Sequence, residues 1–216
     1  MKTNLIVNAL IAGALFFTAC SGDQSDKVEV EEVEKICKYQ VTENSVEVKW
    51  TAYKHQVRTA VGGGFDSVTV SGFIQGESIM DALKGVNFEI YTNSINSNDA
   101  DRDKKIKKHF FGTMNTGALI EGNILSIAEA YAKNTGSGEI SLTMNDSAKN
   151  LPFTWTYEEE LFTLKATVDV GDWEALTALD ALHKICHALH TGEDGKSILW
   201  PDMEVVVSGV IKKNCE

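Results

Sequence analysis

The stretch that decides the fold is "LPFTWTYEEELFTLKATVDV", residues 151–170. Apolar side chains take every second position on both sides of its centre, which predicts two β-strands, each apolar on one face only. Three consecutive glutamates, residues 158–160, cannot share one face and predict the hairpin turn between the strands. The alternating apolar residues are Leu151, Phe153, Trp155 and Tyr157, then Phe162, Leu164, Ala166, Val168 and Val170.

The same period of two recurs through most of the chain. It predicts strands at 46–53, 86–92, 139–144 and 203–211, with further strands around 64–74 and 123–132. A sheet of so many short strands must curl, and closing it removes its exposed edges. We therefore expect a mainly β fold, a closed antiparallel barrel of about 8–10 strands that is wide enough for one ligand. A two-sheet sandwich is the alternative.

Two segments break this period. In "NSINSNDADRDKKIKKHFFGTM", residues 93–114, we expect one short helix near residues 99–110, with Asp99 or Asp101 as its cap. Its lysines would share a solvated face, while Ile106 and Phe110 would anchor it to the barrel.

The second segment is "DWEALTALDALHKICHALHTG", residues 172–192. Apolar residues recur there every three to four positions, which predicts one amphipathic helix near residues 172–190. Asp172 would cap its start, and Gly192 would lie just past its end. The apolar stripe consists of Trp173, Leu176, Leu179, Leu182, Cys186 and Leu189.

The first twenty residues, "MKTNLIVNALIAGALFFTAC", have the charged start, apolar run and small residues of a secretory signal. Thr18-Ala19-Cys20 resembles a bacterial lipobox, so we expect a signal peptide at residues 1–19 and lipidation of Cys20. Ordinary secretion with cleavage near Ala19 is the alternative. Residues 20–36 would form an acidic tether and residues 37–216 the folded domain. By resemblance to other bacterial systems, Ser21 after Cys20 favours the outer membrane of the cell envelope, with the domain facing the periplasm or the cell surface.

Charge and cysteine content limit the partners and the redox setting. The formal net charge of −11 argues against nucleic acid and anionic lipid surfaces as general partners. Beyond Cys20, three cysteines remain for an oxidising compartment, Cys37, Cys186 and Cys215. We favour a disulfide between Cys37 and Cys215, with three independent thiols as the alternative.

Two motifs carry a resemblance to a known family. Val61-Gly62-Gly63-Gly64-Phe65 is similar to an early-strand motif of the YceI-like family. The order Ser94-Ile95-Asn96-Ser97, Arg102-Asp103, Ile106 and Phe110-Phe111 is similar to its most specific signature, with Ser97 in place of the usual Thr. The likeness covers about residues 40–212, while the segment around residues 171–205 departs from the commonest members.

The resemblance implies a lipocalin-like barrel that binds a long apolar lipid of the polyisoprenoid type, in a carrier, storage or sensing role rather than as an enzyme. It implies no cofactor other than a bound isoprenoid or similar lipid, and it leaves a homodimer open. Arg102 and Asp103 would tie their loop to neighbouring groups. The side chains that we expect to face the ligand are Trp50, Phe65, Phe88, Phe153, Trp155, Phe162 and Leu164.

A metal-binding protein of the periplasm is the second hypothesis. His183, His187 and His190 are spaced i, i+4 and i+7 with Asp180 one turn earlier, and imidazoles suit Zn²⁺ or Cu²⁺. One straight helix rarely surrounds a metal alone, so a half-exposed face of titrating histidines is the alternative. A third hypothesis is a scaffold whose barrel is filled by its own side chains. No G-x-S-x-G or H-E-x-x-H motif points to catalysis.

Overall fold

A single curled antiparallel sheet dominates the computed structural model, which describes residues 35–42 and 44–216. Predictions for the signal peptide, Cys20 and the tether up to residue 34 lie outside the described residues. Within the described residues, Lys35–Glu216 forms one compact unit. No helix in that part of the chain is long and apolar enough to cross a membrane.

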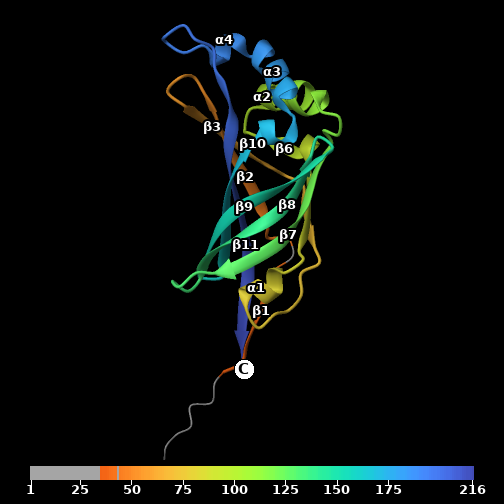
Figure 1. Cartoon of the computed structure of the whole chain (residues 1–216), viewed down its shortest axis with the longest axis vertical. Helices are drawn as coiled ribbons and strands as arrows, with labels where there is room; N and C mark the ends of the chain where they lie inside the picture. Colours follow the sequence, from red (N-terminus) through yellow and green to blue (C-terminus); the bar gives the residue numbers. More distant parts are fainter. Residues whose placement is uncertain (1–34, 43) are drawn as a thin grey trace, which may run out of the picture. The chain divides into compact units, whose positions relative to one another are not determined.

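The described chain contributes eleven strands in the order β4-β5-β7-β8-β9-β10-β11-β2-β3-β6, with β1 added beside β11. All neighbouring pairs are antiparallel, and the sheet curls into a half-barrel (Figure 1). The mainly β prediction is thus confirmed. The strands are β1 Cys37–Val41, β2 Glu47–Lys54, β3 Thr59–Phe65, β4 Val68–Ser71, β5 Asn87–Tyr91, β6 Ile95–Asn96, β7 Leu119–Glu129, β8 Thr135–Met144, β9 Ser147–Glu158, β10 Leu161–Asp169 and β11 Leu199–Cys215.

The hairpin predicted at the three glutamates joins β9 to β10. Glu158 pairs with Leu161, which leaves a two-residue loop, and both loop residues have positive φ (49° at Glu159 and 66° at Glu160). Such loops match the right-handed twist of the strands that they connect. Along β9 buried and exposed side chains alternate, as the sequence predicted for this stretch.

Short helices gather at the two ends of the sheet (Figure 1). The helix expected near residues 99–110 is α2, Ala100–Lys105, continued by the π-helical turn η2, Ile106–Phe110. Asp99 caps it by accepting hydrogen bonds from the backbone N–H groups of Asp101 and Arg102, and the Arg102 bond is the main cause that lowers the pKa of the Asp99 carboxyl. The other short elements here are α1 Ile79–Leu83, η1 Thr92–Ser94 and η3 Phe111–Thr113.

The single amphipathic helix predicted near residues 172–190 is wrong in its continuity. The chain instead forms η4 (Val170–Trp173), α3 (Leu176–Ile185) and α4 (His187–His190). Glu174 separates η4 from α3, because its φ of 58° is left-handed and cannot continue a right-handed helix. Of the predicted apolar stripe, Leu176 and Leu189 are more than half exposed (54% and 56%), while Leu179 and Leu182 pack against the core.

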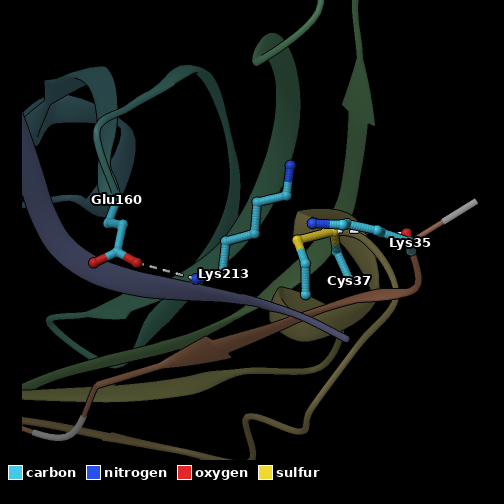
Figure 2. The surroundings of a disulfide bond; sticks show 5 residues. Lys35, Cys37, Glu160 and Lys213 are labelled. Atoms are coloured by element: carbon cyan, nitrogen blue, oxygen red, sulfur yellow. Dashed lines mark hydrogen bonds between the residues drawn. A yellow bond between two sulfur atoms is a disulfide. The ribbon is translucent and has the colours of Figure 1, made fainter.

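A disulfide fastens the two ends of the folded domain. Cys37 and Cys215 lie opposite each other in the β1–β11 pairing, with their Cα atoms 4.0 Å apart, and their sulfurs are bonded (Figure 2). Nearby, the Lys213 backbone N–H donates to Glu160 Oε1, which ties the β9–β10 turn to β11. Cys186 is a free, buried thiol whose pKa is raised by burial.

Candidate ligand-binding cavity

A cavity of about 250 Å³ lies inside the curled sheet. The alternation of the strands produces it, because each strand sends every second side chain inward. Apart from Ser208 and Gly209 on β11, every residue that lines the cavity is apolar. Its wall therefore offers hydrophobic contact and contains no ionisable side chain.

Five of the seven side chains predicted to face a ligand line this cavity, namely Trp50, Phe65, Phe88, Phe162 and Leu164. Phe153 and Trp155 do not line it, although both are buried. The alternation along a strand predicts which face a side chain takes but not whether the interior is hollow at that point. The sequence therefore does not distinguish Phe153 and Trp155 from the five side chains that line the cavity.

The rings of Phe153 and Trp155 instead pack against β8. They lie opposite Gly138 and Gly136, where an added Cβ would come within 2.4 Å of the Phe153 ring and 2.7 Å of Trp155 Nε1. The Trp155 ring also stacks on Phe162, with ring centroids 5.8 Å apart. These two side chains therefore belong to a filled part of the core beside the cavity.

Two of the rings that line the cavity also lie opposite a glycine on the neighbouring strand. Trp50 pairs with Gly63 across β2 and β3, and Phe88 pairs with Gly122 across β5 and β7. A Cβ on Gly63 would lie 2.6 Å from Trp50 Cζ2, and one on Gly122 would lie 2.5 Å from Phe88 Cζ. Both rings therefore lie against the neighbouring strand, which leaves the centre of the interior free.

The helices at one end contribute lining residues that the sequence did not assign to a ligand. Leu179 and Leu182 of α3 reach the cavity, as do Ile106 and Phe110 of η2. Their apolar spacing was visible in the sequence, but whether they face a ligand depends on where the helices dock. The Phe110 and Phe111 rings contact edge to face, with centroids 5.1 Å apart, and both are buried.

A polar network holds the loop that leads into these lining residues. Arg102 donates from Nε to Ser97 Oγ and from its terminal nitrogen to Ser97 O, both at 2.8 Å. Asp103 Oδ1 accepts from the Ser97 hydroxyl and from the Ser97 backbone N–H. Arg102 and Asp103 thus tie the loop to Ser97.

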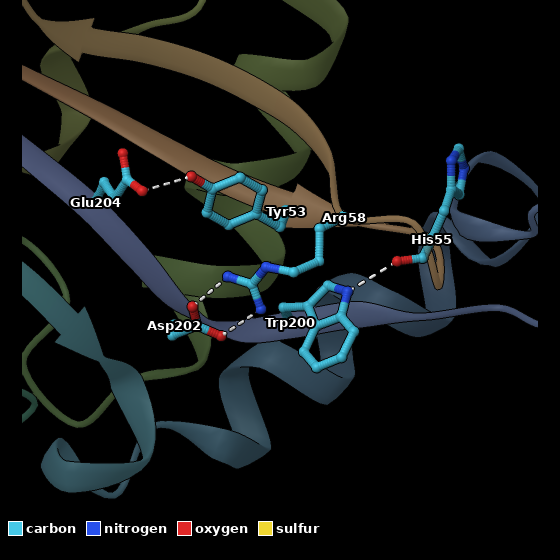
Figure 3. A network of polar contacts seen from close by, with 6 residues as sticks. All are labelled: Tyr53, His55, Arg58, Trp200, Asp202 and Glu204. Atoms are coloured by element: carbon cyan, nitrogen blue, oxygen red, sulfur yellow. Dashed lines mark hydrogen bonds and ion pairs between the residues drawn. The ribbon is translucent and has the colours of Figure 1, made fainter.

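A second polar network lies between the β2–β3 hairpin and β11, at the end of the sheet where α3 and α4 lie (Figure 3). The Arg58 guanidinium lies between the rings of Tyr53 and Trp200, 4.3 and 4.7 Å from their centroids, and binds Asp202 with both terminal nitrogens. The hydrogen bond from Arg58 lowers the pKa of the Asp202 carboxyl. The Trp200 indole N–H donates to His55 O at 2.8 Å.

The proposed metal ligands do not form a ligand set. Asp180 is exposed and pairs with Lys184 at 2.6 Å, while His183 Nε2 bonds Ser197 Oγ at 2.8 Å. His190 is buried after the break at Cys186. In the part of the chain that the structure describes, no group of three or more His, Cys, Asp or Glu is placed to hold a metal ion.

A second, more polar cavity of about 410 Å³ adjoins the apolar one. It lies between the segment after β1 and strand β4, with Thr42, Asn44, Thr69 and Ser71 among its lining residues. Four valines line both cavities, so the two meet along this edge; they are Val41, Val46, Val68 and Val70.

Comparisons with known proteins agree with this geometry. A scan against protein families matches residues 39–198 to the YceI-like domain. The solved structure of Burkholderia cenocepacia BcnA is similar, with a TM-score of 0.52 and 13% identity over 77% of this chain and 96% of that chain. So is a polyisoprenoid binding domain from Saccharophagus degradans implicated in plant cell wall breakdown, with a TM-score of 0.52 and 9% identity over 83% and 99%. A search of curated proteins found no match.

Proposed function

Since the chain belongs to the YceI-like domain family, with residues 39–198 matched, we propose that it binds a long apolar lipid of the polyisoprenoid type inside the sheet. The similar fold of the polyisoprenoid binding domain from Saccharophagus degradans supports this ligand class.

The observation that carries the proposal is the apolar wall of the cavity. A lipid chain that loses about 400 Å² of apolar surface to such a wall gains roughly 10 kcal/mol at about 25 cal/mol/Å², before the costs of association. The wall has one hydroxyl, that of Ser208, and no acid, base or thiol among the described lining residues. This composition supports a non-catalytic role in carriage, storage or sensing.

Closure of the barrel is part of the same proposal. Strands β3 and β4 are separated only by Asp66 and Ser67, and β3 pairs with β6 while β4 pairs with β5. Across this interruption Asp66 N–H donates to Ser94 O at 3.0 Å and Tyr91 N–H donates to Ser67 O at 3.2 Å. These two bonds support a seam that joins the ends of the sheet. Slow amide exchange at Asp66 and Tyr91 would agree with a closed seam, and rapid exchange at both would contradict it.

The remaining parts of the proposal concern the envelope location. We infer a signal peptide at residues 1–19, lipidation at Cys20 and an acidic tether up to residue 36, which would hold the domain at a bacterial outer membrane. Metabolic labelling with an alkyne-bearing fatty acid tests this: label is expected in the wild type and is expected to be lost in Cys20→Ala. Equal labelling of both proteins would contradict lipidation of Cys20.

Lipid extraction of the purified protein tests the binding function. We expect mass spectrometry to find a co-purified long-chain lipid, and a fluorescent prenyl ligand to bind after the protein is stripped. Ala166→Phe places a ring in the cavity and is expected to weaken this binding at least about fivefold. Lys165→Phe is the matched control, because Lys165 is the exposed neighbour on the same strand.

Two outcomes would count against the function. One is a wild-type protein that carries no lipid and takes up no prenyl ligand. The other is an Ala166→Phe protein that binds as tightly as Lys165→Phe, since binding would then occur outside the cavity.

A further inference from the structure

Short helices close both ends of the apolar cavity. At one end α1 contributes Leu83 to the cavity wall, and at the other end α3 contributes Leu179 and Leu182 while η2 contributes Ile106 and Phe110 (Figure 1). A ligand that entered past either end would have to displace these packed apolar side chains into water, which costs free energy.

The side of the sheet, in contrast, contains a slot that no backbone hydrogen bond spans. One flank of the slot is the segment that runs from β1 into β2 and bonds to β11, and the other flank is β4, which bonds to β5. The ladder between β2 and β3 ends at the pair Lys49 and Gly64. The next backbone bonds join Tyr39 and Gly76, at 2.8 and 3.0 Å. Between these two points, no described residue of one flank bonds to the backbone of the other.

The polar cavity of about 410 Å³ occupies this slot. Its polar lining residues come from both flanks and are Thr42, Asn44, Thr69 and Ser71. Thr69 and Ser71 are exposed to solvent, so the slot opens outward. It also opens inward, because four of its valines, two from each flank, line the apolar cavity as well.

We propose that this slot is the entrance through which the apolar ligand reaches the cavity. The inference rests on the proposed function and adds the route that the ligand takes. Paired strands resist separation, because their backbone donors and acceptors would lose their partners beside an apolar interior. The slot has no such bonds to break. The valines at its base present only methyl groups, so an apolar chain that crosses them stays in hydrophobic contact.

An entrance determines the rates of binding but not the affinity, and this distinguishes it from the wall of the cavity. Thr69 lines the polar cavity and not the apolar one, so Thr69→Trp places a ring over the slot without changing the wall. We expect association and dissociation both to become roughly tenfold slower, while Kd changes by less than about twofold. Thr154→Trp is the matched control and should bind as the wild type does. Thr154 is an exposed threonine of β9, a strand that is paired on both sides.

Stopped-flow fluorescence measures both rates on the full-length protein after it is stripped of lipid. The probe is all-trans-retinol, an isoprenoid that is itself fluorescent. Association is followed on mixing, and dissociation on adding an excess of phosphatidylcholine vesicles that take up the released retinol. Ser71→Trp, on the same flank of the slot, is a second obstructing variant and replaces Thr69→Trp if circular dichroism shows that the latter does not fold.

Unchanged rates in the obstructing variants would overturn the inference and leave the proposed function standing, because the ligand would then enter past one of the helical ends. Faster dissociation with unchanged association would also overturn it, since the slot would then belong to the binding wall. A wild type that binds neither retinol nor any other prenyl ligand would instead overturn the proposed function.

Discussion

At the scale of single residues, glycines decide how far each aromatic ring enters the interior. Trp50 and Phe88 lie against Gly63 and Gly122 of the neighbouring strands. Because the missing Cβ lets each ring lie along the wall, large side chains fill the interior surface without filling its centre. The same device at Gly136 and Gly138 lets Trp155 and Phe153 pack the core beside the cavity.

Gly63→Ala tests this device. The new Cβ would lie 2.6 Å from Trp50 Cζ2 and 2.8 Å from Asn96 O, so the ring or the β6 backbone must move. We expect a loss of about 1–3 kcal/mol in the free energy of unfolding, measured by urea denaturation. Gly62→Ala is the control, since its nearest atom, Trp50 O, is 3.3 Å away. Equal losses in the two variants would show that the Trp50 contact is unimportant.

Arg102 offers a second test at this scale. Arg102→Lys keeps the charge but loses the planar fork that binds both Ser97 Oγ and Ser97 O. We expect unfolding to become easier by about 1–2 kcal/mol in urea. Lys104→Ala, which removes an exposed pair with Asp101 on the same helix, should have no measurable effect. An unchanged Arg102→Lys protein would contradict a structural role for this network.

At the scale of the elements, the short β1 strand depends on its partner at the far end of the chain. It pairs only with the end of β11 and adds the backbone bonds between Tyr39 and Gly76. The Cys37–Cys215 disulfide links residues separated by 178 positions, so it holds this pairing together. The breaks at Glu174 and Cys186 act at the same scale, because they limit α3 to Leu176–Ile185, from which Leu179 and Leu182 line the cavity.

Removal of the disulfide is therefore expected to weaken the whole fold. The double substitution Cys37→Ser and Cys215→Ser should cost about 2–5 kcal/mol of unfolding free energy, because closing so long a loop restricts the unfolded chain. Reductant should likewise lower the midpoint of thermal unfolding of the wild type, because it breaks the same disulfide. A Cys186→Ala protein should keep this response to reductant, because Cys186 is a free thiol. A midpoint of the wild type that reductant leaves unchanged would contradict the expectation.

At the scale of the whole molecule, the described acidic side chains lie outside the apolar cavity, with α1 at one end of the sheet and α2, α3 and α4 at the other. Histidines cluster near this helical end. His183 lies 5.3 Å from His190 between ring centroids, and His55 Nε2 lies 3.2 Å from Leu189 O. Burial, together with the nearby His183 and Lys54, lowers the pKa of His190 to about 4.

Stability should therefore fall in mild acid. Between pH 6.5 and about 4 the unfolded chain binds a proton at His190 that the folded chain does not bind, so unfolding becomes easier as the pH falls through this range. We expect the wild type to lose about 1–2 kcal/mol more than His190→Leu between pH 7.5 and pH 4.5 in urea titrations. His109→Gln is the control and should follow the wild type. Parallel pH curves for the wild type and His190→Leu would contradict this role.

Much of the fold could be read from the sequence because strand alternation is local. The period of two in residues 151–170 determined the strands, the inward face of each and the turn at the glutamates. The motif around Ser97, Arg102 and Phe110 determined the capped helix and the family. Each of these features depends on residues within a few positions of one another, so their spacing alone specifies them.

Only the tertiary structure decided which inward side chains surround a hollow. Phe153 and Trp155 follow the same alternation as Phe162 and Leu164, yet only the second pair lines the cavity. The difference depends on glycines and rings of the neighbouring strands, namely Gly136 and Gly138 of β8 and Phe162 of β10. The unpaired indole N–H of Trp50 also follows from the tertiary structure, because only the positions of all its neighbours show that no acceptor among the described residues bonds to it. Both features depend on packing across pairs of strands, which the alternation within one strand does not specify.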